Sequence, residues 1–310
     1  MYIMLESVFP AVVPVFSIIL IGFLIGRKTS YNLGFPTDIT MYFTLPALVF
    51  STLVHKWDTP FLAKTFLITG SGTAFIIFGT GILAMIYIKA SKKEEAKSLY
   101  PTVMFIASGN FVLTLDYFAF GYEGFLRGIF FQMVNTSLMF TLGVYMVGGE
   151  TSLRKIILTP FFVAAMSGAL IWVFHIKLPD VVLHSVDFLG KSALPLLLLM
   201  LGFSLSNIHI SNMSLALAGG IMRIFGGLGV AIIFVLLLRF FDIISYSEDE
   251  LLTIKLLVFN GGMPAAVGTF LLAQKYNRNP ELVASSVFAS TLIGLLTIPF
   301  VLWSVNYFMS

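Results

Sequence analysis

The stretches Ser108-Gly109-Asn110 and Asn260-Gly261-Gly262-Met263-Pro264 each interrupt a long apolar run of this sequence. The shift that places Asn110 on Pro264 also superimposes the two surrounding apolar runs without a gap. Two broken hydrophobic segments at corresponding places in the halves of a chain are the pattern that marks the binding site of many membrane transporters. The expected fold is built outward from these two breaks.

The composition predicts a membrane protein. Of the 310 residues, 58% are hydrophobic and only 11% are charged, and the mean hydropathy is +0.98. Such a chain has too little polar surface to cover a soluble globule, so most of its side chains must face membrane lipid or one another. We therefore expect a multi-pass, all-α protein of the cell membrane with no soluble domain attached.

The same composition excludes several kinds of site. The sequence has no cysteine, so disulfides, thiolate metal sites and a cysteine nucleophile are ruled out. The basic residues lie in short loops rather than along one face, so the net charge of +3 does not indicate a nucleic-acid partner. We expect no metal and no cofactor. Because no hydrolase or nucleotide-binding motif is found, we also expect no enzyme activity.

Polar segments divide the sequence into ten expected transmembrane helices of roughly 20 residues each. They cover approximately 7–26, 38–54, 62–89, 99–120, 125–148, 155–175, 186–205, 213–240, 251–274 and 281–308. Pro46 in the second span and Pro195 in the seventh predict a break or kink in each helix. We expect a single transmembrane domain, 1–310, with one five-helix repeat over about 1–150 and another over about 151–310. Because five is odd, the second repeat is inverted.

The loops predict the orientation in the membrane. If the N-terminus is outside, the inner loops hold more basic residues than the outer loops, and the run 89–97 supplies much of the difference. This bias places both termini outside, because basic residues favour the inner side. The run itself is better explained as a solvated loop near the anionic inner leaflet than as a substrate site.

The two breaks are expected to line one buried polar site. Unpaired main-chain groups inside a bilayer cost several kcal/mol each unless protein or a watery cavity satisfies them. If helices 4 and 9 cross at their breaks, the opposed helix ends supply partial positive and negative charge, which suit an anion and a cation or proton. The alternative is that the glycines only permit close helix packing. The expected substrate-binding residues are Ser108, Gly109, Asn110, Thr114, Asn260, Gly261, Gly262, Met263 and Pro264.

Two charged residues stand within apolar spans. Asp116 is an acid deep in the fourth span, where a carboxylate costs about 2.5 to 3.5 kcal/mol and should be partnered, protonated or open to a cavity. We expect Asp116 to bind a coupling ion, either a proton or sodium; the alternative is a position at the membrane interface. Arg223 in the eighth span is the candidate charge partner of Asp116 or contact for an anionic substrate. The alternative for Arg223 is that it reaches the lipid headgroups.

Four stretches, taken in order, resemble the auxin efflux carrier family of membrane transporters. They are Leu45-Pro46-Ala47-Leu48-Val49-Phe50-Ser51, the segment from Ser192-Ala193-Leu194-Pro195 to Leu201-Gly202-Phe203-Ser204-Leu205, the segment from Met263-Pro264-Ala265-Ala266 to Ala273-Gln274-Lys275-Tyr276, and the segment from Pro280-Glu281-Leu282 to Thr297-Ile298-Pro299. The resemblance implies two inverted five-helix repeats that meet at crossed fourth and ninth helices, as in bile-acid symporters and sodium/proton antiporters. It also implies export or exchange of small organic anions by an elevator-like movement.

The fourth span departs from the pattern of that family. Family members usually carry a proline after the Gly-Asn element, whereas here Asp116 stands close to the place expected for it after Gly109-Asn110. This departure favours coupling to a cation or proton. We therefore expect a secondary transporter of a small organic anion, surrounded by membrane lipid, with a homodimer as one candidate assembly. The alternatives are a sodium-coupled bile-acid-type symporter and a non-transporting membrane sensor or enzyme on the same fold.

Overall fold

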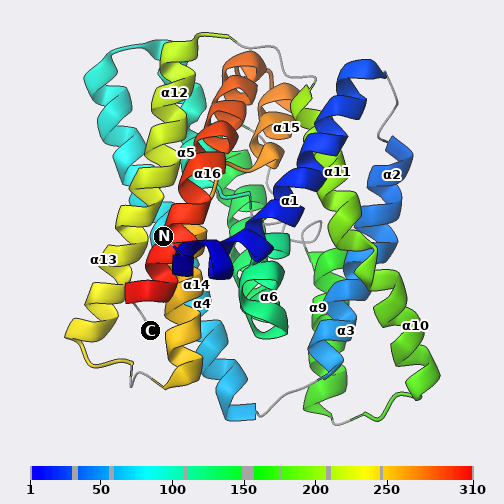
Figure 1. Ribbon diagram of the computed structural model, residues 1–310. Helices are drawn as coiled ribbons and strands as arrows, with labels where there is room; N and C mark the ends of the chain where they lie inside the picture. The colour runs from blue at the N-terminus through cyan, green and yellow to red at the C-terminus, as the bar shows by residue number, and fades with distance from the viewer. Residues whose placement is uncertain are drawn as a thin grey trace. The chain divides into compact units, whose positions relative to one another are not determined.

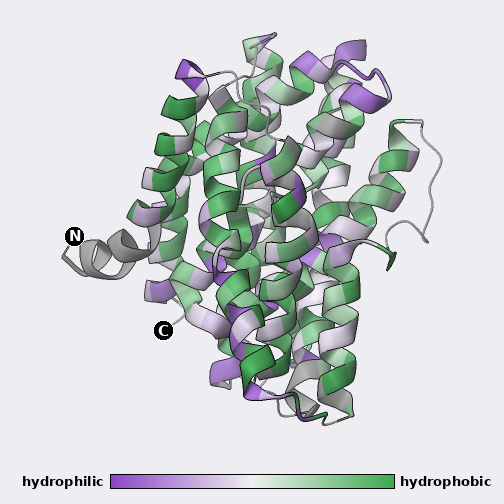
Figure 2. Ribbon diagram, turned by 90° about the vertical axis from the view of Figure 1, so that its right-hand side faces the viewer, coloured by the Kyte–Doolittle hydropathy of each residue, from purple (hydrophilic) through white to green (hydrophobic). Residues whose placement is uncertain are grey.

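The computed structural model describes residues 2–29, 34–55, 59–107, 111–148, 157–174, 176–206, 211–244 and 247–308, and these are almost entirely helical (Figure 1). Hydrophobic residues cover most of the length of the helices, and hydrophilic residues gather near helix ends and in loops (Figure 2). Within these ranges, five helical stretches are long and apolar enough to cross a membrane: Ala63–Ser91, Leu113–Met146, Asp180–Phe203, Met213–Phe240 and Pro280–Tyr307. The described residues are thus nearly all helical and include five helices of membrane length, in line with the expected helical membrane protein.

The described residues do not provide ten helices of membrane length, because several expected spans consist of shorter pieces. Two further apolar helices, Tyr42–Val54 and Pro160–Ile171, are too short to meet the same criterion. The ninth span is divided into Glu248–Gly261 and Val267–Lys275, and neither piece is long enough to cross a bilayer alone. The first piece of the fourth span, Leu99–Met104, is likewise too short. The arrangement of ten helices in two inverted repeats stays a prediction.

Two compact units are distinguished by their internal packing. The first unit comprises Met1–Val13, Leu67–Thr151 and Ile208–Ser310, and the second comprises Pro14–Phe66 and Ser152–Asn207. Each unit therefore combines segments from both of the predicted repeats.

The second unit is built mainly from six helices or parts of helices among the described residues. They are most of α1 (Tyr2–Lys28), α2 (Gly34–Ile39), α3 (Leu45–His55), α9 (Pro160–Val173), α10 (Asp180–Lys191) and α11 (Ala193–Ser206). Helices α1 and α11 approach one another at glycines. A Cβ atom on Gly22 would overlap the main chain of Leu199, and one on Gly202 would overlap the carbonyl of Ile19. Only residues without a side chain permit backbones to pack this closely.

The two predicted helix breaks of the second unit lie at irregular places. Pro46 is the second residue of α3 and follows a π-helical turn, Thr40–Thr44, in which the amide of Leu45 donates to the carbonyl of Thr40. The helix is therefore widened, not cut, just before the residue that lacks an amide donor. Pro195 lies in the first turn of α11, which is separated from α10 by the single residue Ser192.

The first unit contains the remaining helices. They are the greater part of α4 (Thr59–Ser91), followed by α5 (Leu99–Met104), α6 (Leu113–Leu138), α7 (Val144–Met146), α12 (Met213–Ile221), α13 (Gly227–Phe240), α14 (Glu248–Gly261), α15 (Val267–Lys275) and α16 (Pro280–Phe308). Helix α6 is kinked at Gly121, whose φ of 67° lies in the left-handed region that glycine adopts without steric cost.

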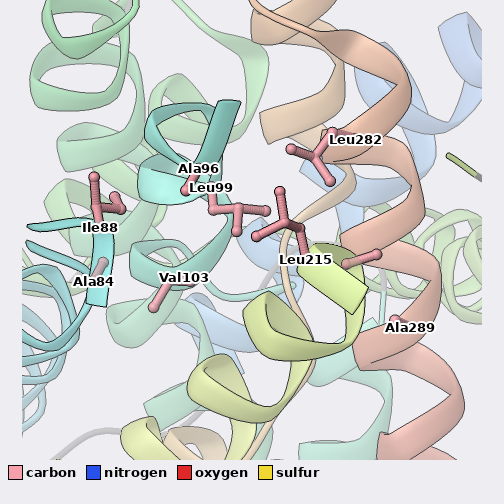
Figure 3. Close-up of a cluster of buried hydrophobic side chains, with 9 residues drawn as sticks. Ala84, Ile88, Ala96, Leu99, Val103, Leu215, Leu282 and Ala289 are labelled. Carbon is pink, nitrogen blue, oxygen red and sulfur yellow. The ribbon is translucent and has the colours of Figure 1, made fainter. Parts of the chain in front are cut away.

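A buried apolar cluster ties α4, α5, α12 and α16 together (Figure 3). Its members are Ala84, Ile88, Ala96, Leu99, Val103, Leu215, Ala216, Leu282 and Ala289. Helices α12 and α16 pack closely because Gly219 and Gly220 lie against Ser286 and Ser290, where any Cβ atom would meet atoms of α16. The cluster fixes the end of α5 beside α12, and the turn that follows α12 carries Arg223.

Both predicted interruptions fall in the first unit. The break in the ninth span is confirmed, because α14 ends at Gly261 and α15 begins at Val267. In the fourth span, α5 ends at Met104 and Phe105 is already extended, with φ −98° and ψ 135°, which is earlier than the predicted break. Residues 108–110, on which that prediction was placed, lie outside the described residues. The chain is helical again from Leu113.

Candidate functional site

The two interrupted segments of the first unit pair with one another through their main chains. Ile106 and Ala265 form an antiparallel bridge. The amide of Ala107 donates to the carbonyl of Pro264 at 2.9 Å, and the amide of Ala266 donates to that of Phe105 at 3.0 Å. We refer to residues 105–107 and 262–266 as the junction. The breaks of the fourth and ninth spans therefore meet directly, within a single unit.

Two polar side chains from other helices complete the hydrogen bonding of the junction. The side-chain amide of Asn135 in α6 accepts from the amide of Ile106 at 3.2 Å and donates to its carbonyl at 3.0 Å. The hydroxyl of Ser290 in α16 accepts from the amide of Ala265 at 3.0 Å. These bonds satisfy main-chain groups that an interrupted helix leaves unpaired, and all of the residues concerned are buried. Neither Asn135 nor Ser290 is among the site residues expected from the sequence.

Asp116 lies beside the junction and is fully buried. It occupies the first turn of α6, and its Oδ2 accepts a hydrogen bond from Nδ2 of Asn260 at 3.1 Å. Within the described part of the chain, no donor reaches Oδ1 of Asp116 or Oδ1 of Asn260. Gly128 makes room for the carboxylate, since a Cβ atom there would overlap Oδ2. The pair thus joins the start of α6 to the end of α14 and leaves two buried oxygen acceptors for a further partner.

Arg223 is also fully buried, and it binds main-chain oxygens rather than an acid. It lies in a π-helical turn, Met222–Gly226, between α12 and α13. Its Nη1 donates to the carbonyls of Val103 at 2.8 Å and Met104 at 3.1 Å. Its Nη2 donates to the carbonyl of Gly261 at 2.9 Å. None of the bonds described for Arg223 involves Asp116, so the expected charge pair is not a direct contact.

The position of Arg223 explains why α5 ends earlier than the sequence pattern indicates. The last carbonyls of a helix have no partner within it and must be satisfied from outside. Here the guanidinium supplies donors to Val103 and Met104, and Asn135 supplies both partners of Ile106. The carbonyls of Val103, Met104 and Ile106 therefore have partners where the chain leaves the helix at Phe105.

The remaining predicted site residues fall into three groups. Those that belong to or directly precede the junction in the ninth span are buried, namely Asn260, Gly261, Gly262, Met263 and Pro264, and Thr114 in the first turn of α6 is buried as well. Ser108, Gly109 and Asn110 belong to the part of the fourth span that lies outside the described residues. Pro46 and Pro195 belong to the second unit. The junction therefore brings together the described members of the predicted substrate site and the predicted ion site.

The charges near the junction are few. The carboxylate of Asp116 reaches Asn260, and the next carbonyl along the chain, that of Gly261, accepts from Arg223. One negative and one positive side chain are thus linked through two residues of α14. In the parts of the chain that the structure describes, no group of three or more His, Asp or Glu residues could hold a metal ion. The arrangement can accept a proton or a single cation at Asp116 and presents a fixed positive charge nearby.

A second buried arginine binds at the start of α14. Nε of Arg127 donates to the hydroxyl of Thr253 at 3.0 Å, and Nη1 donates to the carboxylate of Glu123 at 2.9 Å. Its Nη2 lies 3.7 Å from the carboxylate of Asp249. This cluster joins α6 to the first turn of α14. Sequence reasoning missed it because Arg127 follows the glycine kink and has the appearance of a loop residue.

The sequence is similar to known transporters. Residues 146–302, slightly more than half of the chain, match the family described as membrane transport protein. An uncharacterized transporter of Methanocaldococcus jannaschii is 27% identical over 279 residues, which cover 84% of this chain and 86% of that protein. An uncharacterized transporter of Methanothermobacter thermautotrophicus is 26% identical over an alignment of 316 residues, gaps included. The alignment covers 95% of this chain and 96% of that protein.

Proposed function

Since the chain belongs to the membrane transport protein family, the family of the auxin efflux carriers, we propose that it is a secondary transporter of a small organic anion. The observation that carries the proposal is the junction, where two interrupted helices meet in a buried setting beside Asp116. In secondary transporters, substrate and coupling ions bind where discontinuous helices present their ends. The proposed substrate site comprises the junction and the predicted residues next to it.

A fixed positive charge supports an anion as the substrate. Arg223 carries a guanidinium that no acid contacts directly in the described part of the chain, and its charge acts in a medium of low polarity. Asp116 compensates that charge only while it is ionised. When a proton or a sodium ion neutralises Asp116, the positive charge of Arg223 is uncompensated and an anion binds more favourably. We propose that this charge balance couples the anion to the ion.

An elevator-like movement is the proposed mechanism. The junction, Asp116 and Arg223 all belong to the first unit, and their bonds are made within it. A site that is complete within one compact unit can be carried across the membrane by movement of that unit as a body. The proposal requires no motion inside the junction itself.

Transport assays in proteoliposomes test the proposal. Liposomes with purified protein are loaded with an unlabelled carboxylate, and uptake of the same carboxylate in labelled form is followed for malate, malonate and indole-3-acetate. We expect exchange of at least one of these anions above the rate of protein-free liposomes. The matched control is Gly229→Ala, because a Cβ atom at Gly229 meets nothing within 4 Å. Uptake that never exceeds the protein-free rate for any carboxylate, with or without pH and sodium gradients, would contradict the proposal.

A further inference from the structure

Three main-chain oxygens converge on one point of the first unit. They are the carbonyl oxygens of Val103, Met104 and Gly261, and we call them the cradle. Val103 and Met104 are the last residues of α5, and Gly261 is the last residue of α14. The C-terminal end of a helix carries a partial negative charge of roughly half an electron. Two such ends pointing at one place form a site for a positive charge.

The occupant of this site is part of the chain. The guanidinium of Arg223 is 0% exposed and is bound by the cradle alone, since its Nε has no partner within the described residues. In transporters with interrupted helices, helix C-termini and unwound carbonyls of this kind coordinate a diffusible cation. We infer that Arg223 is a tethered cation, and that the cradle is a cation site whose permanent ligand is the protein's own guanidinium.

The surroundings are shaped for a guanidinium. A Cβ atom on Gly227 would overlap Nη2 of Arg223 and the carbonyl oxygen of Gly261. One on Gly261 would lie 2.5 Å from Cβ of Ala231 and 2.8 Å from the carbonyl oxygen of Gly227. Glycine at 227 leaves room for the guanidinium, and glycine at 261 lets α14 approach α13 closely. The π-helical turn Met222–Gly226 widens the helix at the point where the arginine leaves it.

Besides any role in transport, the guanidinium holds the ends of α5 and α14 together. Both ends would face one another with like partial charge if the guanidinium were removed, and three buried carbonyls would lose their donors. Arg223 is thus a positioning residue: it sets where α5 and α14 end and thereby where the junction lies. Its role can be measured on purified protein whether or not a substrate is known.

Chemical rescue tests the inference. Arg223→Ala removes the guanidinium and leaves a space of its shape beside the cradle. We expect the variant to unfold at a temperature about 10 °C below the wild type in detergent. Millimolar guanidinium chloride should restore a substantial part of that loss, because a ligand that binds only the folded state raises its stability. The same additive should not raise the midpoint of the wild type, whose cradle is occupied.

Two further additives distinguish the effect of the charge of guanidinium from the effect of its shape. Urea has nearly the shape of guanidinium but no charge, and choline chloride supplies a cation too large for the space. Neither should restore Arg223→Ala. If urea or choline restores the variant as well as guanidinium does, or if guanidinium has no effect on it, the cradle is not a cation site and the inference is overturned.

A second pair of variants covers the case in which Arg223→Ala does not fold. Gly227→Ala keeps the arginine but pushes a methyl group into its guanidinium, whereas Gly229→Ala lies on the same helix and meets nothing. We expect a clear fall in the unfolding midpoint for Gly227→Ala and none for Gly229→Ala. Equal midpoints for the two variants would contradict a guanidinium held at this place.

Discussion

The two buried arginines of the first unit, Arg127 and Arg223, are held in different ways. Arg127 binds the carboxylates of Glu123 and Asp249, whose side chains are 54% and 63% exposed, together with the hydroxyl of Thr253. In the described part of the chain, the bonds of Arg223 go to the carbonyls of the cradle, next to the junction. An arginine near water is balanced by acids, whereas one deep in the unit is balanced by helix ends. The charge of Arg223 is therefore not compensated by a contacting acid in the described residues, whereas that of Arg127 is.

The comparison predicts a large difference in stability when each charge is removed. Arg223→Met leaves three buried carbonyls without donors, at about 1 to 3 kcal/mol for each group. Arg127→Met leaves two half-exposed acids that water can solvate, so we expect about 1 kcal/mol. The check is the denaturant midpoint of both variants in the same detergent. A loss for Arg127→Met as large as that for Arg223→Met would mean that helix ends and acids hold the two arginines equally.

The junction should be weakened next most strongly by changes at its side-chain supports. Asn135→Leu removes two bonds to Ile106, and Ser290→Ala removes one bond to Ala265. We expect losses of about 2 to 4 kcal/mol and about 1 to 2 kcal/mol respectively, because each leaves buried main-chain groups unpaired. Thermal unfolding measures both. Thr136→Ala, the neighbour of Asn135 in α6, serves as a control, and a larger loss there than in Asn135→Leu would contradict the assigned roles.

A change in stability similar in size to that of Ser290→Ala is expected where the room for Asp116 is reduced. Gly128→Ala places a methyl group against Oδ2 of the carboxylate and against Leu113, and overpacking of this kind costs about 1 to 3 kcal/mol. Gly70→Ala is the matched control, because its Cβ atom would meet only a methyl group of Val134 at 3.4 Å. The measured quantity is again the unfolding midpoint. If the two variants have the same unfolding midpoint, the carboxylate of Asp116 does not lie against Gly128.

The sequence pattern predicts the fold class and the place of the site better than the contacts within it. The apolar composition and the break near Pro264 are enough to expect a helical membrane protein with an interrupted ninth span. Asp116 is conspicuous because an acid in an apolar span needs a physical explanation. The residue that donates to the carboxylate of Asp116 is Asn260. This pairing depends on how α6 and α14 pack, and residue types in one sequence do not specify the packing of two helices.

The sequence does not reveal which groups the side chains of Arg223, Asn135 and Ser290 bind, and the reason is the same for all three side chains. Each binds main-chain atoms, and every residue has the same main-chain atoms, so the partner has no recognisable residue type. A usable signal did exist. The shift that superimposes the two breaks also places Thr136-Ser137 on Ser290-Thr291, which indicates polar residues at corresponding places of the helices that support the junction.

We propose that Asp116 binds the coupling ion beside a fixed positive charge. Asp116→Asn is the direct test, because the amide resembles the neutralised acid and can still contact Asn260. In the wild type, binding of a carboxylate that stays ionised throughout a pH series should strengthen as pH falls, since protonation of Asp116 leaves Arg223 uncompensated. Sodium should have the same effect if it is the coupling ion.

The decisive measurement is the dissociation constant of that carboxylate for wild type and Asp116→Asn, taken over the pH series with and without sodium. We expect the variant to bind at every pH, with an affinity near that of the fully protonated wild type and no dependence on pH or sodium. A variant that keeps the pH or sodium dependence of the wild type would show that the coupling ion binds elsewhere.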